Sequence, residues 1–158
     1  MLTKEEVKQT RLLFWSEFDN YSTRKKKKLR KPVKWIMNNT GIKQLKLKFD
    51  IDEKRALVGI DVETRNLDKR IDVFGKLERL KTILETAMGQ SLTWELDHSL
   101  PTGKSISRAY VYLDGVSIYK KDNWPGIFDF FYKNMTLLEK VFEEYKDYLK
   151  YSEPNEEN

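Results

Sequence analysis

Residues 45–63 read LKLKFDIDEKRALVGIDVE, and their alternation is the clearest structural pattern in the chain. In both halves every second residue is apolar, a period typical of strands that bury one face. A hairpin closed between residues 52 and 55 places three apolar pairs opposite one another: Phe49 with Val58, Leu47 with Ile60, and Leu45 with Val62. Facing apolar pairs normally fix a register. A slip of two residues would keep the same faces, so the pattern favours this register without excluding the slipped one.

Helices and strands are predicted on both sides of the hairpin. Before it, residues 3–21 have helical spacing, with Thr3 and Glu6 as a capping box, and residues 33–37 form a first strand. After it, a helix begins at Asn66 or Asp68 and ends at residue 88, with Gly89 following it. Strands are predicted over residues 92–97 and 106–113, and a turn at residues 114–115 continues the second over 116–119.

The last helix is predicted to begin near residue 123. Its apolar stripe has steps of three and four and consists of Ile127, Phe131, Met135, Leu138, Phe142, Tyr145 and Leu149. The element order α-β-β-β-α-β-β-α predicts an α+β fold, an antiparallel or mixed sheet of about five strands packed by three helices. Residues 1–151 are interpreted as one domain, and residues 152–158 as a polar tail.

Composition excludes several classes of protein. The 158 residues contain no cysteine, which excludes disulfides and thiolate zinc sites. No stretch approaches the ~18 apolar residues of a membrane span. The N-terminus is charged where a signal peptide would be apolar, so we expect a cytoplasmic protein. We predict no cofactor, no catalytic residue and no metal ligand.

Positive charge is concentrated in one region. Residues 20–49 contain eleven basic residues and no acidic one, leaving 19 of the 30 basic residues against all 25 acidic residues elsewhere. Such a region attracts polyanions, and a neighbouring aromatic ring can stack on an unpaired base. The candidate contacts to DNA or RNA are Arg24, Lys25, Lys26, Lys27, Lys28, Arg30, Lys31, Lys34, Trp35, Lys46 and Lys48. The alternative is a solvated loop that supplies only solubility.

A metal-dependent nuclease is a further alternative, since the element order resembles the core of PD-(D/E)XK nucleases. The candidates are Asp50 and the DVETR segment at residues 61–65. Arg65 occupies the position of the usual lysine, and the register puts Asp50 roughly 13 Å along the strands from Asp61. We therefore predict an exposed ion pair between Lys46 and Asp61 instead of a metal site.

Two isolated motifs carry no chemistry on their own. The TGKS segment at residues 102–105 lacks the first glycine of a phosphate-binding loop, because position 98 is histidine, and a strand follows it. His98 is the single histidine and is interpreted as a surface loop residue. In the last helix, Phe128, Phe130 and Tyr132 widen the apolar arc, which favours a homodimer or a docked partner as another function.

Four segments resemble one known family: RLLFWSEF at 11–18, KPVKW at 31–35, GQSLTWE at 89–95 and NWPG at 123–126. It is a bacterial and archaeal family of domains of unknown function, found alone or C-terminal to restriction-endonuclease-like nuclease domains. The resemblance covers residues 5–149 and implies a nucleic-acid context with a nuclease partner, but no active site. The lysine run at 25–28 departs from the family pattern. The sequence thus predicts a non-catalytic accessory domain that binds nucleic acid through a lysine-rich loop.

Overall fold

The computed structural model describes residues 2–28 and 42–150. Within them the chain forms four α-helices, four strands and one short 3-10 helix. In chain order they are α1 (Lys4–Lys28), β1 (Leu45–Ile51), β2 (Arg55–Val62), α2 (Leu67–Arg79), α3 (Lys81–Met88), β3 (Thr93–Ser99), β4 (Ser105–Asp114), η2 (Lys121–Asn123) and α4 (Trp124–Lys150). The strand predicted over residues 33–37 lies outside the described residues.

The four described strands form one antiparallel sheet in the order β1-β2-β4-β3. The predicted hairpin register is confirmed, because Phe49 faces Val58, Leu47 faces Ile60 and Leu45 faces Val62. The turn closes as expected, with the backbone N–H of Asp52 donating to the carbonyl of Arg55. The α+β class is therefore confirmed, and the sheet is antiparallel.

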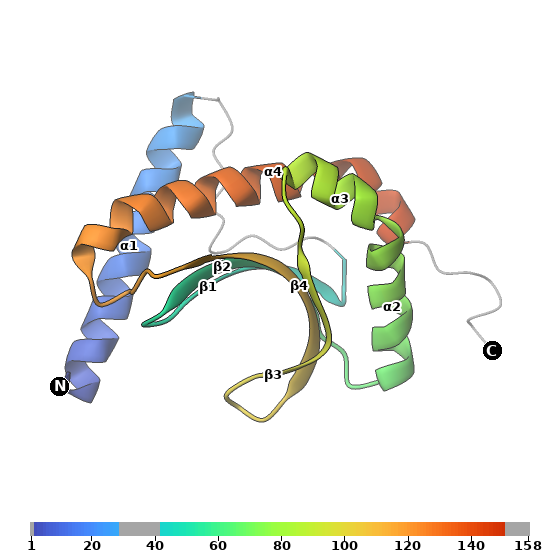
Figure 1. Cartoon of the computed structure of the whole chain (residues 1–158), viewed down its shortest axis with the longest axis horizontal. Helices are drawn as coiled ribbons and strands as arrows, with labels where there is room; N and C mark the ends of the chain where they lie inside the picture. The colour runs from blue at the N-terminus through green and yellow to red at the C-terminus, as the bar shows by residue number, and fades with distance from the viewer. Residues whose placement is uncertain (1, 29–41, 151–158) are drawn as a thin grey trace.

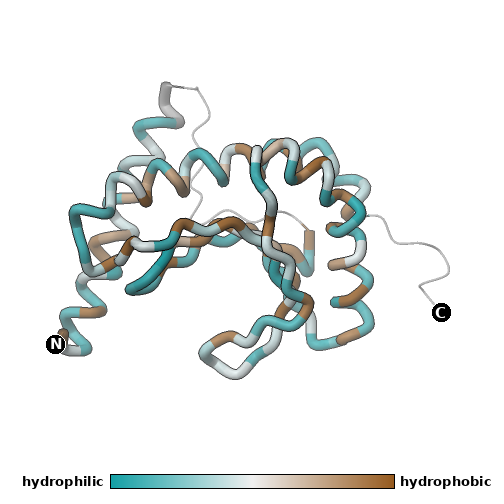
Figure 2. The backbone as a smooth tube through the Cα atoms, viewed as in Figure 1, coloured by the Kyte–Doolittle hydropathy of each residue, from teal (hydrophilic) through white to brown (hydrophobic). Residues whose placement is uncertain are grey.

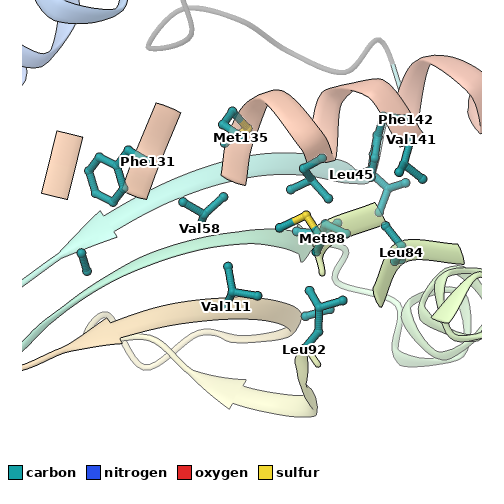
Figure 3. Close-up of a cluster of buried hydrophobic side chains, with 14 of the residues drawn as sticks. Leu45, Val58, Leu84, Met88, Leu92, Val111, Phe131, Met135, Val141 and Phe142 are labelled. Carbon is teal, nitrogen blue, oxygen red and sulfur yellow. The ribbon is translucent and has the colours of Figure 1, made fainter. Parts of the chain in front are cut away.

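The helices cover one face of the sheet. In Figure 1, α4 runs across the sheet with α1 near its start and α3 near its end, and the sheet curves away from these helices. Side chains from both layers meet between them, where Phe131 and Met135 of α4 lie above Val58 of β2 (Figure 3). In Figure 2 hydrophobic residues recur along the strands and helices that line this interior, whereas the tip of the β1–β2 hairpin is hydrophilic.

Helix α1 is longer than predicted. Its capping box is confirmed, since the backbone N–H of Thr3 donates to Glu6 and that of Glu6 donates to the Thr3 hydroxyl. The helix continues through Arg24–Lys28, so the interpretation of these residues as a loop is wrong. Lysine and arginine are good helix formers, and cations are favoured at a helix C-terminus, so the run prolongs the helix.

The helix predicted between the two hairpins is two helices. Asn66 caps α2 and Gly89 ends α3 with a φ of 70°, both as predicted, but the helix breaks at Leu80. The break turns the chain so that α3 packs along α4 (Figure 1). A single straight helix would carry Leu84 and Met88 away from the core in which they are buried.

The continuation predicted over residues 116–119 does not form a strand. The described sheet has four strands instead of about five, and the remaining predicted strand, at residues 33–37, lies outside the described residues. Gly115 has a φ of 75°. The chain then crosses the end of the β1–β2 hairpin, where the N–H groups of Gly115 and Val116 donate to the carbonyl of Lys54. These two N–H groups are therefore not available to pair with β4, as a strand running back along it would require.

Helix α4 buries the predicted stripe, with Tyr145 only partly buried. The ring of Phe128, which lies off that stripe, is 5.2 Å from Phe14 and 5.5 Å from Phe18, both on α1. The wide apolar arc is thus explained by α1 packing within one chain. None of the described helices is long and apolar enough to cross a membrane.

Candidate functional site

The structure separates the predicted nucleic-acid contacts. Arg24–Lys28 form the last turns of α1, on the helix side of the sheet. Lys46 and Lys48 lie on β1, where the alternation that buries Leu45 turns them to the opposite face. The remaining candidates lie outside the described residues: Arg30, Lys31, Lys34 and Trp35. Lys46 and Lys48 therefore do not share a surface with the described end of α1.

We call the sheet face without helices the open face. Alternation along the four strands assigns to it Lys46, Lys48, Asp50, Arg55, Leu57, Gly59, Asp61, Thr93, Glu95, His98, Ile106, Arg108, Tyr110, Tyr112 and Asp114. Gly59 lies opposite Tyr110, and a Cβ at residue 59 would lie 2.7 Å from the Tyr110 Cβ. Only glycine lets the two central strands approach so closely, so the Tyr110 side chain has room here.

An ion pair between Asp61 and Arg108 lies at the centre of the open face. The guanidinium donates from Nε to Oδ1 at 2.7 Å and from Nη2 to Oδ2 at 2.9 Å, a two-pronged contact. Only 3% of the Asp61 side chain and 6% of the Arg108 side chain are exposed. Burial alone would lower the pKa of Arg108, but the bonds and charge of Asp61 outweigh it and raise that pKa.

His98 extends this pair toward β3. Its Nε2 lies 3.3 Å from Arg108 Nη1, and its Nδ1 lies 2.6 Å from a carboxylate oxygen of Glu95. A guanidinium only donates, so Nε2 accepts and Nδ1–H donates to Glu95. Glu95 also accepts from the hydroxyl of Tyr110 at 3.2 Å. Burial, followed by the charge of Glu95, raises the pKa of the Tyr110 hydroxyl. His98 thus belongs to β3 and to this network, and its interpretation as a loop residue is wrong.

The ion pair predicted between Lys46 and Asp61 is also wrong, although the two residues do face each other. Asp61 binds Arg108, and Lys46 binds Glu63 at 3.2 Å. Asp50 lies 3.7 Å from Arg108 Nη1, so one guanidinium contacts both carboxylates of the proposed nuclease pair. No three described His, Asp or Glu side chains are grouped to hold a metal ion.

Glu63 is held between two lysines at the edge of the open face. Its carboxylate lies 3.2 Å from the ammonium of Lys46 and 3.3 Å from that of Lys104, which precedes β4. Burial alone would raise the pKa of Glu63, but the two lysines outweigh it and hold the pKa below 4.5. Lys104, from the TGKS segment, therefore connects the β3–β4 turn to the end of β2.

This contact predicts a pH-dependent contribution to stability. A depressed folded pKa stabilises the fold above the unfolded pKa, and the effect is lost as the pH falls through the folded pKa. Glu63→Gln is expected to lower the free energy of unfolding by ~0.5–1 kcal/mol at pH 7. The difference from wild type should shrink below pH 4.5 in urea titrations. Glu53→Gln, in the exposed turn of the same hairpin, is the control, and an equal pH dependence there would contradict the assignment.

The outer part of the open face carries exposed aromatic and basic groups. The Arg55 guanidinium lies 4.9 Å from the ring centre of Tyr112 and 5.5 Å from that of Tyr110. Tyr112 remains 43% exposed. Lys48 faces Gly59 on the neighbouring strand, and no described carboxylate forms an ion pair with it. Arg55 and Tyr112 were missed because only the pairing of β2 with β4 brings them together on the face that also carries Lys48.

The chain matches one known protein family. Residues 10–146 match the family model described as a domain of unknown function, DUF4268. The chain belongs to the DUF4268 family. No curated protein and no solved structure matches it. The DUF4268 match extends from α1 into the last turns of α4, so every residue of the open face lies within it.

Proposed function

We propose that this DUF4268 domain binds single-stranded nucleic acid on the open face of its sheet. The observation that carries the proposal is the exposed ring of Tyr112, stacked with Arg55 on a helix-free antiparallel face that also carries Lys48. Sheet faces with exposed aromatic rings bind unpaired bases by stacking, while lysine and arginine neutralise the phosphates.

The charges of the open face are compatible with a polyanion. The two most buried carboxylates are already neutralised, Asp61 by Arg108 and Glu63 by Lys46 and Lys104. Arg55 lies against the Tyr112 ring, and Lys48 lies farther along the same face, in the row of Gly59 and Tyr110. A base stacked on Tyr112 would bring its own phosphate toward Arg55, and a strand continuing across the face would bring another phosphate toward Lys48.

The preference for single-stranded over duplex nucleic acid follows from the exposed Tyr112 ring. Bases in a duplex are stacked on one another, so the Tyr112 face can reach only an unpaired base. The family resemblance, with its nuclease-linked members, supports an accessory role in nucleic-acid processing. The proposal keeps Lys46 and Lys48 among the contacts and adds Arg55 and Tyr112, while Arg24–Lys28 lie on the other side of the sheet.

The test is fluorescence anisotropy with a labelled single strand and the matching duplex over a series of salt concentrations. Tyr112→Ala is expected to weaken single-strand binding about tenfold, the typical loss of one base–aromatic stack. Lys48→Gln should reduce the slope of log K against log salt by about 0.7, the loss of one phosphate contact. Tyr148→Ala is the control, because that ring is 37% exposed on α4, in the helix layer.

Two results would refute the proposal. The first is wild-type affinity in Tyr112→Ala, and the second is tighter binding of the duplex than of the single strand. A variant with alanine at residues 25–28 separates the two basic surfaces. If it loses all binding while Tyr112→Ala keeps it, the end of α1 is the contact surface and the open face is not.

A further inference from the structure

A groove of about 740 Å³ lies between the second half of α1 and the start of α4. The two helices that supply its walls lie on the helix side of the sheet, away from the open face (Figure 1). Its volume falls within the range of small-molecule sites. The lining residues are Glu17, Asn20, Thr23 and Arg24 from α1, with Lys121, Trp124, Pro125 and Phe128 opposite them.

The two walls differ in chemistry. Residues 17, 20 and 24 are spaced by three and four, so α1 presents them on one face as a polar wall. The opposite wall is mainly apolar, formed by Trp124, Pro125 and Phe128. A ligand with one polar and one apolar side would contact both walls at once.

The groove is held in shape by contacts behind it. The hydroxyl of Tyr21 on α1 donates to Asp129 on α4, and the Tyr21 ring lies 5.5 Å from Phe128. The indole N–H of Trp124 donates to the carbonyl of Ile118 at 2.8 Å. A site formed before its ligand arrives loses little conformational entropy on binding.

The two sides carry one cation each. Arg24 lies on the α1 wall and Lys121 on the other, with its ammonium 5.7 Å from the ring centre of Trp124. No described carboxylate forms an ion pair with either cation. Lys25 lies 5.6 Å from the Tyr21 ring, at the next position along α1. An arginine and a lysine on opposite walls can both bind a phosphate, and Glu17 is the one carboxylate among the lining residues.

From these observations we infer that the groove binds a phosphate attached to a planar ring, as in a nucleotide. The phosphate lies between Arg24 and Lys121, and the ring rests on Pro125 and the edges of Trp124 and Phe128. The same chemistry occurs in a free nucleotide and at the phosphorylated end of a nucleic-acid strand. The inference does not depend on the open face, because no residue is shared between the two sites.

Isothermal titration calorimetry with adenosine monophosphate, adenosine and inorganic phosphate tests the inference. The monophosphate is expected to bind more tightly than either part alone. Arg24→Gln and Lys121→Gln should each weaken that binding about tenfold, the usual loss of one charged hydrogen bond. Lys120→Gln is the matched control, since Lys120 is exposed, precedes Lys121 and does not line the groove. Thermal unfolding of each variant checks that the fold is intact.

Competition separates the two sources of phosphate. If an oligonucleotide with a 5′ phosphate displaces the monophosphate, and the same strand with a 5′ hydroxyl does not, the ligand is the end of a strand. If neither oligonucleotide displaces it, the ligand is a free nucleotide. The inference is overturned if neither phosphorylated probe binds at millimolar concentration, if inorganic phosphate binds as tightly, or if both glutamine variants bind like wild type. Tyr112→Ala should leave groove binding unchanged, so failure of either site is recognised separately.

Discussion

Arg108→Leu is expected to lower the free energy of unfolding by about 3–5 kcal/mol. Leucine removes both hydrogen bonds to Asp61, whose side chain is only 3% exposed. The carboxylate would then be buried without its charged partner. His98 would lose the donor to its Nε2 at the same time.

Urea unfolding at pH 7 measures this loss. Arg55→Leu is the control, because Arg55 is a partly exposed arginine on the same face that lies against the rings of Tyr110 and Tyr112. The double variant Asp61→Leu with Arg108→Leu should recover most of the stability, since it leaves no buried charge. A cost below about 1 kcal/mol for Arg108→Leu, or a double variant less stable than the single one, would contradict the argument.

Phe131→Ala should cost a similar amount, about 3–5 kcal/mol, because it opens a cavity where three elements meet. The Phe131 ring on α4 is fully buried and lies 4.8 Å from Phe49 on β1. It also lies 5.3 Å from Phe18 and 6.0 Å from Trp15, both on α1. Its loss should therefore loosen α1 more than the sheet.

Hydrogen exchange distinguishes this local effect from a general loss of stability. Amides in the middle of α1 should lose protection beyond the change in global stability, whereas those of β2 and β4 should follow it. Phe130→Ala is the control, because its ring is only partly buried against the core. Equal losses for the two variants, or unchanged exchange in α1, would show that Phe131 does not join α1 to the sheet.

Local patterns were sufficient for several elements. The register of β1 with β2 is the one that facing apolar residues across a short turn favour, although this pattern alone also allowed a slip of two residues. Local patterns likewise predicted the Thr3–Glu6 capping box, Gly89 at the helix end and the apolar stripe of α4. Each depends on residues a few positions apart, whose geometry one helix or hairpin sets by itself.

Contacts between residues far apart in the sequence were not predicted by the same reasoning. Alternation puts Asp61 on the face opposite the core, but it does not say which strand pairs with the other edge of β2. That strand is β4, which brings Arg108 to Asp61 across 47 positions and Tyr112 beside Leu57. The predicted partner, Lys46, is instead drawn to Glu63.

The amino-acid sequence alone thus determined the α+β class, the central hairpin and the apolar faces. These features depend on the conformational propensity and the hydrophobic periodicity of residues a few positions apart. Tertiary packing decided where α1 ends relative to α4, that the lysines of β1 and the end of α1 lie on opposite sides, and that a buried arginine neutralises Asp61. These depend on which surfaces meet when the layers close, and a period of two or 3.6 residues carries no information about a partner 40 or more positions away.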